Sequence, residues 1–446
     1  MKITGIDIGE YRQFKNIKFD FTYPADHPKA GQPLEKVCFI GQSGTGKTTL
    51  LTIIWNFFQL LEDSYLAINN QEIIHSNWGK FDFFSSPLSI IIENKGSVYS
   101  YQTEDLSKYD RLINVRIGIL MKWLENNNLI DTIKNTQKLS LLIKESIARE
   151  ADAFLFDQKN QPQTFSDFIK TDTQVEKEKV DYEGRISTAG SKKVISLGDM
   201  QSLSTWQYLL KEIDDYDEAT VTQIKNIIQN TPKATVTEEL QKWVEADPRI
   251  KLAEECLNPI LNYFFLELND GETGNVPITL RTRQGVKIDS SNMSTGTRQL
   301  LATAIPIYKF DTTDTVILFD EPERSLFPDI QRRLIQYYKD LAPQAQFFFA
   351  THSPIIASAF EPCERFILYF DENGEVKCRN GVAPIGDDPN DVLRQDFGLN
   401  ELMLDKGLEA YQEYRRLGSL IRQETDEKRK NELIADRIEL GNRYNF

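Results

Sequence analysis

The feature that most constrains the fold is a glycine-rich segment at 41–48, which reads Gly-Gln-Ser-Gly-Thr-Gly-Lys-Thr. It fits the pattern G-x-x-x-x-G-K-[ST] without a mismatch, after an apolar run at 37–40 and before a stretch of helical periodicity. Glycines in such a loop let backbone N–H groups point at phosphate oxygens, and the following helix adds the positive end of its dipole. The segment therefore predicts a nucleotide-binding α/β domain.

The polar side chains of this loop have distinct expected tasks. Lys47 would neutralise charge on the β- and γ-phosphates, and Thr48 would place its hydroxyl on Mg²⁺. The expected cofactors are therefore ATP and Mg²⁺. The residues expected to bind the nucleotide here are Gly41, Gln42, Ser43, Gly44, Thr45, Gly46, Lys47, Thr48 and Thr49.

A second buried run, 315–319, ends in two carboxylates, Asp320 and Glu321. A continuous β-branched and aromatic run is typical of a strand in a parallel sheet, and its carboxyl end lies at the edge where nucleotides bind. Asp320 suits the Mg²⁺ shell, and Glu321 suits the polarisation of an attacking water. Taken alone, such a pair is equally well a solvated turn. Beside a phosphate loop it predicts an ATPase.

Charge and composition limit the classes of partner that the chain is expected to bind. The chain has 446 residues, with 52 lysines and arginines against 67 acidic residues, a net charge of −15. This field repels nucleic acid, so DNA contact needs a local basic patch. The longest apolar run, 50–61, is too short to span a bilayer, and the first twenty residues lack a signal-peptide pattern. We expect a cytoplasmic protein with no membrane partner. Four scattered cysteines and three histidines argue against a zinc site or a disulfide scaffold.

Three further segments resemble ABC-type ATPases, in the branch that includes the RecF, SMC and OLD-like proteins. Residues 293–299 (Met-Ser-Thr-Gly-Thr-Arg-Gln) resemble the signature segment, 320–328 resemble the Walker B motif and D-loop, and 350–354 (Ala-Thr-His-Ser-Pro) resemble the switch-histidine loop. The chain departs from the usual pattern in reading STG in the signature and in placing Phe327 where a histidine is common.

The resemblance implies roles for residues that the loop motif does not cover. Two heads would clamp two nucleotides, with Ser294 and the N–H of Gly296 reaching a γ-phosphate across the dimer. Ser294 is equally expected to cap its own helix. His352 would hydrogen-bond the γ-phosphate and the attacking water, so Glu321 and His352 are the expected catalytic residues. Arg12 lies where related heads place a nucleotide-contacting residue, although a surface arginine fits as well. The candidate for a Q-loop metal contact is Gln102.

The resemblance covers about half of the chain, in two blocks that must fold together. We predict the α/β fold of a split ABC-type P-loop ATPase head with a helical insertion and a helical C-terminal tail. The expected divisions are 1–105 and 276–385 for the two parts of the head, 106–275 for the insertion and 386–446 for the C-terminal region.

A head without a recognisable nuclease pattern resembles the ATPase subunits of bacterial phage-defence operons such as PARIS and Septu. This predicts a sensor that assembles as a head-to-head dimer or higher homo-oligomer and controls a separately encoded effector, a nuclease or toxin, with a phage-encoded trigger as another partner. The alternative is a RecF-like DNA-repair ATPase, supported by the basic stretch at 281–287 together with Lys192 and Lys193. A third hypothesis is a binding module in which nucleotide is a structural ligand.

Overall fold

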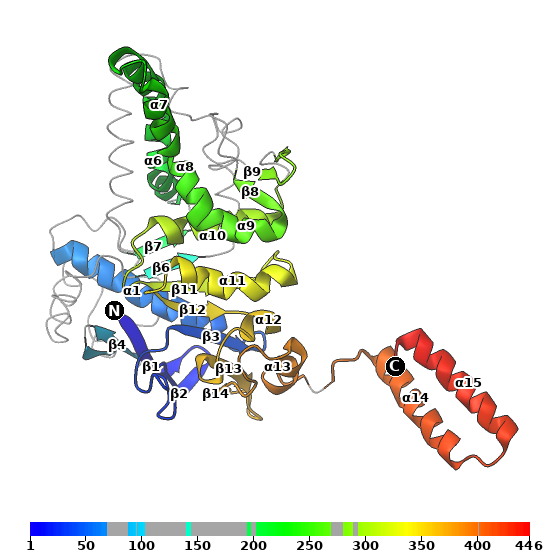
Figure 1. The fold of residues 1–446 in the computed structure, drawn as a ribbon. Coiled ribbons are helices and arrows are strands. Elements are labelled where there is room, and N and C mark those ends of the chain that lie inside the picture. The colour runs from blue at the N-terminus through cyan, green and yellow to red at the C-terminus, as the bar shows by residue number, and fades with distance from the viewer. Residues whose placement is uncertain are drawn as a thin grey trace, which may run out of the picture. The chain divides into compact units, whose positions relative to one another are not determined.

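The computed structural model describes residues 1–68, 88–94, 96–102, 140–143, 194–197, 202–268, 280–288, 293–399 and 401–446. The chain forms two compact units, Met1–Asp387 and Asp388–Phe446, which are described separately below and drawn in Figure 1.

A seven-stranded sheet forms the centre of the first unit, with the order β14-β13-β3-β12-β11-β6-β7. β14 is antiparallel to β13, and the other neighbouring strands are parallel. The carboxyl ends of β3, β12 and β11 therefore meet at one edge. The strands are β3 Lys36–Gly41, β6 Ser140–Ile143, β7 Val194–Leu197, β11 Val316–Asp320, β12 Gln346–Ala350, β13 Arg365–Phe370 and β14 Val376–Asn380.

Two strands of this sheet come from the range 106–275, which the sequence predicts to be a helical insertion. β6 pairs in parallel with β11, and β7 pairs in parallel with β6. The expectation of a helical insertion is therefore wrong for Leu266–Leu268, which forms a strand of another sheet, and for these two segments. β6 and β7 are each four residues long, and such short apolar runs do not separate strand from helix by periodicity alone.

Two antiparallel sheets accompany the central one. The first has the order β2-β1-β4-β5 and consists of β1 Lys2–Tyr11, β2 Phe14–Asp20, β4 Leu88–Asn94 and β5 Ser97–Gln102. Its two expected hairpins, β1–β2 and β4–β5, are confirmed. The second sheet has the order β10-β9-β8 and consists of β8 Leu266–Leu268, β9 Leu280–Thr282 and β10 Lys287–Ile288.

The core lies on both faces of the seven-stranded sheet. On one face, Phe21 from the segment after β2 contacts Phe348 and Phe366, with ring centroids 5.2 Å apart in both pairs. Helix α1, Lys47–Ile68, contributes its apolar side to the same cluster. On the other face, Phe319 stacks on Tyr338 at 4.5 Å. This face is covered by α10 Thr295–Lys309, α11 Pro328–Leu341 and α12 Pro354–Ala357 (Figure 1).

The helices between β7 and β8 form a separate layer of the first unit. Tyr216 of α6 stacks on Trp243 of α7 at 4.8 Å. The hydroxyl of Tyr337 on α11 donates to the carbonyl oxygen of Cys256 at 2.8 Å and so joins this layer to a helix that covers the seven-stranded sheet. The elements are α6 Ser202–Asn230, α7 Val236–Glu245, α8 Pro248–Lys251, a π-helical segment Leu252–Leu257, α9 Asn258–Leu261 and η7, a 3-10 turn, Asn262–Phe264.

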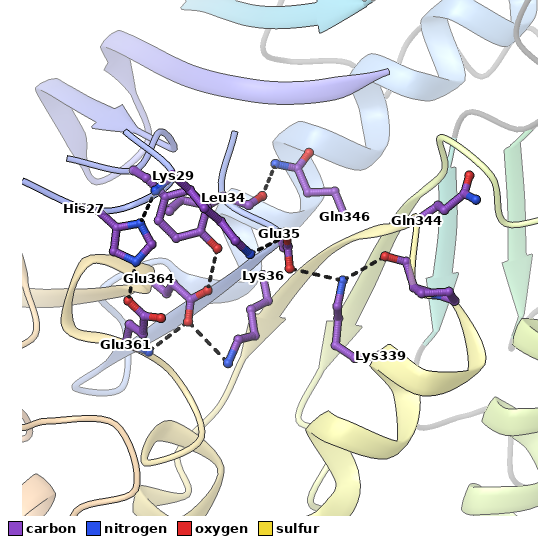
Figure 2. A network of polar contacts seen from close by, with 12 residues as sticks. His27, Lys29, Leu34, Glu35, Lys36, Lys339, Gln344, Gln346, Glu361 and Glu364 are labelled. Carbon is purple, nitrogen blue, oxygen red and sulfur yellow. Dashed lines mark hydrogen bonds and ion pairs between the residues drawn. The ribbon is translucent and has the colours of Figure 1, made fainter. Parts of the chain in front are cut away.

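A polar network closes the amino edge of the seven-stranded sheet, as Figure 2 shows. The buried carboxylate of Glu364, in the 3-10 turn Pro362–Glu364, lies 3.3 Å from the Lys36 ammonium and accepts a hydrogen bond from the Tyr23 hydroxyl at 3.3 Å. Burial raises the pKa of Glu364, and Lys36 opposes this shift. The Gln346 amide exchanges two hydrogen bonds with the backbone of Ile3, at 2.7 and 2.9 Å. The Gln346 contacts join β1 of the N-terminal sheet to β12, and the Lys36 ion pair joins the start of β3 to the turn before β13.

The second unit is helical, as expected for the C-terminal region. It contains α13 Pro389–Gln395, α14 Asp405–Gln423 and α15 Glu427–Tyr444. The Arg437 guanidinium lies 4.3 Å from the centroid of the Tyr414 ring, and Phe446 contacts the same ring at 5.6 Å. The α14–α15 pair therefore covers part of its own apolar surface, including Leu417. No helix in the described residues of either unit is long and apolar enough to cross a membrane.

Candidate nucleotide-binding site

The glycine-rich segment forms the turn from β3 into α1, as the sequence predicts. Gly41, Gly44 and Gly46 have φ of +141°, +86° and +103°, which L side chains rarely adopt. A Cβ on Gly41 would lie 2.0 Å from the carbonyl oxygen of Leu368, and a Cβ on Gly46 would lie 2.3 Å from Gln13 Nε2. The loop is therefore defined by backbone conformation and by close packing of its neighbours.

Lys47 is buried inside this loop, where its ammonium donates to the carbonyl oxygens of Gly41 at 2.9 Å and Gln42 at 3.1 Å. Burial lowers the pKa of Lys47, and the carboxylates of Glu321 and Asp320 act in the opposite direction. Burial thus deprives the Lys47 ammonium of part of its hydration, and a phosphate group bound in the loop would compensate for that loss.

The acidic strand end meets the loop at the sheet edge. Thr48 Oγ1 donates to Asp320 Oδ1 at 3.2 Å, although the two residues are 272 positions apart in the chain. A hydroxyl and a carboxylate are ligands that suit Mg²⁺, which commonly takes one or two protein oxygens and completes its shell with phosphate and water. The described residues contain no group of three or more His, Cys, Asp or Glu side chains able to hold a metal.

Glu321 and His352 also meet at this edge, on the ends of neighbouring strands. Glu321 Oε1 lies 3.9 Å from His352 Nε2, and the two side chains are 41% and 44% exposed. The φ of Glu321 is +52°, and its N–H donates to the carbonyl oxygen of Ala350 at 2.8 Å. Such a left-handed conformation at a non-glycine residue is a strain often found at functional sites. The geometry gives both side chains access to a reacting group above the phosphate loop.

Glu323 is a site residue that the sequence reasoning missed. Its Oε1 accepts hydrogen bonds from Thr351 Oγ1 at 2.6 Å and from the backbone N–H of His352 at 3.0 Å. Its Oε2 is buried and has no hydrogen-bond partner among the described residues. The second glutamate of the Asp-Glu-Pro-Glu segment was the available signal, but the partner loop lies about 30 positions away. Glu323 therefore positions the loop that carries His352.

Two glutamines extend these contacts to the helices around the site. Gln331 on α11 donates to the carbonyl oxygen of Leu326 at 2.8 Å and accepts from Ser353 Oγ at 2.7 Å. Gln299 on α10 donates to the carbonyl oxygen of Pro322 at 3.3 Å. The segments resembling the signature, the D-loop and the switch loop are therefore joined by hydrogen bonds within one chain.

We expect Glu323→Ala to lower kcat for ATP hydrolysis by about tenfold with a smaller change in KM, because it removes two hydrogen bonds to a charged acceptor that hold the His352 loop. Glu323→Gln keeps an acceptor oxygen and should recover most of the rate. Steady-state phosphate release and a thermal unfolding curve for each variant check this. A loss of kcat that Glu323→Gln does not relieve would contradict the positioning role.

Ser294 and Gly296 lie at the start of α10. Ser294 Oγ accepts from the Thr297 N–H at 3.1 Å, so the N-cap expectation is confirmed. Gly296 packs against the D-loop of its own chain, where an added Cβ would lie 2.3 Å from the Ser325 carbonyl oxygen. The expected reach of these residues to a second head concerns another copy and stays a prediction.

Arg12 and Gln102, the remaining residues expected at the site, lie in a turn and at a strand end of the four-stranded sheet. Arg12 occupies the β1–β2 turn with φ of +51°, and its guanidinium lies 5.2 Å from the Tyr11 ring centroid. The neighbouring Gln13, which the sequence reasoning missed, donates to Thr49 Oγ1 at 3.4 Å and is the turn residue that contacts the loop helix. Gln102 ends β5, at the edge of the four-stranded sheet, and its side chain lies outside the described residues.

The chain matches one protein family and is distantly similar to several solved structures. Residues 1–357 match the family AAA_15, described as AAA ATPase domain. No curated protein matches the sequence significantly. Among solved structures, an SMC head bound to the C-terminal winged-helix domain of ScpA is 13% identical (TM-score 0.38, covering 86% of this chain and 98% of that one). An SMC head with an extended coiled coil, bound to the C-terminal domain of ScpA and derived from Pyrococcus furiosus, is 11% identical (0.36, 85% and 96%). The SMC head domain from Thermotoga maritima is 11% identical (0.38, 86% and 100%).

The family match and the sheet topology together confirm the predicted fold class, an α/β P-loop ATPase fold with a helical C-terminal region.

Proposed function

Because the chain belongs to the AAA ATPase domain family, which its residues 1–357 match, we propose that it binds ATP with Mg²⁺ at the carboxyl edge of the seven-stranded sheet and hydrolyses it to ADP and phosphate. The observation that carries this proposal is the contact of Thr48 with Asp320 at 3.2 Å, since it joins the phosphate loop to the acidic strand end. Only an arrangement with both parts can bind the phosphates and their metal together.

Each side chain then has a task in hydrolysis. The loop N–H groups and the Lys47 ammonium bind and orient the phosphates. Thr48 and Asp320 would hold Mg²⁺, which neutralises phosphate charge when bound. Glu321 accepts a proton from the attacking water, and His352 donates a hydrogen bond to a γ-phosphate oxygen. Glu323 keeps His352 in place through the backbone N–H contact at 3.0 Å.

The site further supports assembly through the heads. Ser294 is exposed at the start of the 15-residue helix α10, so its hydroxyl and the N–H groups ahead of Thr297, whose own N–H Ser294 caps, are the groups left for an anion. We expect these groups to complete the nucleotide site of a second copy. The packing of Gly296 on the D-loop would then transmit the state of one site to the other.

The cellular role in this proposal is control of a separately encoded effector, a nuclease or toxin, in bacterial anti-phage defence, with a phage-encoded molecule as trigger. The net charge of −15 favours a protein with a basic surface as partner. Affinity purification of the Glu321→Gln form from the native host, with and without infection, followed by mass spectrometry tests this role. Recovery of a nuclease or toxin encoded beside it supports the role, and recovery of DNA-repair proteins alone supports the RecF-like alternative.

That alternative, a RecF-like ATPase that binds DNA when ATP is bound, depends on the basic stretch at 281–287. One of its cations is already paired, because Arg281 Nε lies 2.8 Å from Glu267 Oε1. ATP-dependent binding of duplex DNA that weakens steeply with salt would favour the alternative over effector control.

A further inference from the structure

A pocket of about 1140 Å³ opens on the first unit, away from the phosphate loop, where η7, β8 and the end of β9 face the start of α11. Its lining combines three arginines, Arg283, Arg332 and Arg333, with two aromatic rings, Tyr263 and Phe265. The ATPase proposal assigns no task to any of these residues.

The three arginines of the pocket outnumber the two acidic residues of its described lining, Glu267 and Asp329. Within the described part of the chain, none of their guanidinium groups is paired with a carboxylate, and the hydrogen bond of Arg283 goes to the carbonyl oxygen of Asn262 at 3.2 Å. All three side chains are exposed. In a chain with 67 acidic residues, three neighbouring arginines without a carboxylate partner point to an anionic ligand.

The Phe265 and Tyr263 rings are exposed, and each lies beside one of these arginines. The Arg283 guanidinium lies 5.0 Å from the Phe265 ring centroid, and that of Arg333 lies 4.2 Å from the Tyr263 ring centroid. Phe265 is 67% exposed and Tyr263 is 44% exposed. Phe265 also has φ of +57°, a conformation that costs free energy in a bulky residue. Exposed rings in a strained, cation-lined position suit a flat aromatic ligand.

We propose that this pocket binds a nucleobase together with its phosphate, supplied by a free nucleotide or by single-stranded nucleic acid. A ligand of carboxylates alone would pair with the arginines and leave the rings in water. An apolar segment would cover the rings and leave the arginines unpaired. A base stacked beside a phosphate satisfies both groups. Duplex DNA keeps its bases stacked inside the helix and does not offer this combination.

The acidic residues of the pocket lining limit how many nucleotides of a ligand the pocket can contact. Glu267 is neutralised by Arg281, whereas Asp329 in the first turn of α11 lies beside the arginines and opposes a phosphate. A short ligand contact of a few nucleotides is therefore expected, rather than a long track along a polyanion.

The position of the pocket connects it to the nucleotide site. Helix α11 begins at Pro328, directly after the D-loop, and Gln331, next to Arg332, bonds both Leu326 of that loop and Ser353 of the switch loop. A ligand on Arg332 and Arg333 would therefore lie one residue away from a side chain that contacts both loops of the nucleotide site.

The test measures fluorescence anisotropy of labelled single-stranded decathymidylate without ATP, so a failure of ATP hydrolysis does not affect it. We expect Arg332→Ala/Arg333→Ala to weaken binding by about tenfold or more and to reduce its salt dependence. Tyr263→Leu should weaken binding by about fivefold or more without a change of charge. The matched control, Arg415→Ala/Arg416→Ala on α14, removes the same charge and should change the affinity by less than about twofold.

Competition in a Lys47→Ala background, which disables the phosphate loop, identifies the source of the ligand. Displacement by thymidine monophosphate assigns the pocket to free nucleotides, and displacement only by oligonucleotides assigns it to single strands. The proposal is overturned by absence of binding to the wild type, by full binding to the arginine or tyrosine variant, or by equally effective displacement with hexaglutamate.

Discussion

Glu321→Gln is expected to lower kcat for ATP hydrolysis by about 100-fold or more while ATP still binds. The substitution keeps the size and hydrogen-bonding shape of the side chain but removes the base that accepts a proton from water, a contribution of about 10²–10⁴ in rate. Because Glu321 lies 3.9 Å from His352 at the open sheet edge, the change should leave the phosphate loop intact. Phosphate release measures kcat, and titration with a fluorescent ATP analogue measures binding.

The matched control is Glu372→Gln, an isosteric change at an exposed glutamate in the β13–β14 turn, which should leave both quantities unchanged. With ATP and Mg²⁺, the Glu321→Gln form should also accumulate a dimer or higher oligomer in size-exclusion chromatography with light scattering. Turnover equal to that of the wild type would remove Glu321 from the mechanism. Slow turnover with no self-association would keep the ATPase and contradict assembly through the heads.

Gly41→Ala is expected to lower the free energy of unfolding by about 3 kcal/mol or more, or to prevent folding. The added Cβ would lie 2.0 Å from the Leu368 carbonyl oxygen, and this contact is with backbone, which cannot move without breaking the pairing of β3 with β13. The φ of +141° adds strain. Urea unfolding followed by circular dichroism measures the change.

Gly44→Ala serves as the control in the same loop. Its φ is +86°, but the nearest atom to an added Cβ is Phe370 Cζ at 3.9 Å, so the expected cost is that of the left-handed conformation alone, about 1–2 kcal/mol. Equal unfolding free energies for the two variants would show that the close approach of Leu368 does not limit the loop.

The parts of the site that could be predicted from sequence are those formed by continuous sequence motifs. The octet at 41–48 and the run ending at Asp320 each specify a strand, a turn and a chemistry locally, and the structure places both at the same sheet edge. The four-residue strands β6 and β7 were not predictable, because parallel pairing with β11 depends on contacts far away in the chain.

Gln13 and Glu323 could not be predicted as site residues for the same reason. Gln13 reaches Thr49 of α1 from the β1–β2 turn, and Glu323 reaches the His352 backbone from a different strand end. Neither glutamine nor glutamate has a spacing that marks such a task, and the adjacent Arg12 was the more conspicuous residue. Side-chain contacts between segments that are separate in the chain are determined by tertiary packing and leave little trace in a single sequence.

The order of strands in the central sheet has a consequence for the growing chain on the ribosome. β3 carries the phosphate loop, yet both of its hydrogen-bonded neighbours, β12 and β13, are made long after it. At about 5–20 residues per second, the 272 positions between Thr48 and Asp320 take on the order of tens of seconds to synthesise. During that time the nascent chain exposes an apolar strand with no partner, so this protein should depend on chaperones during synthesis, and fragments that end before β12 should neither fold this sheet nor bind ATP.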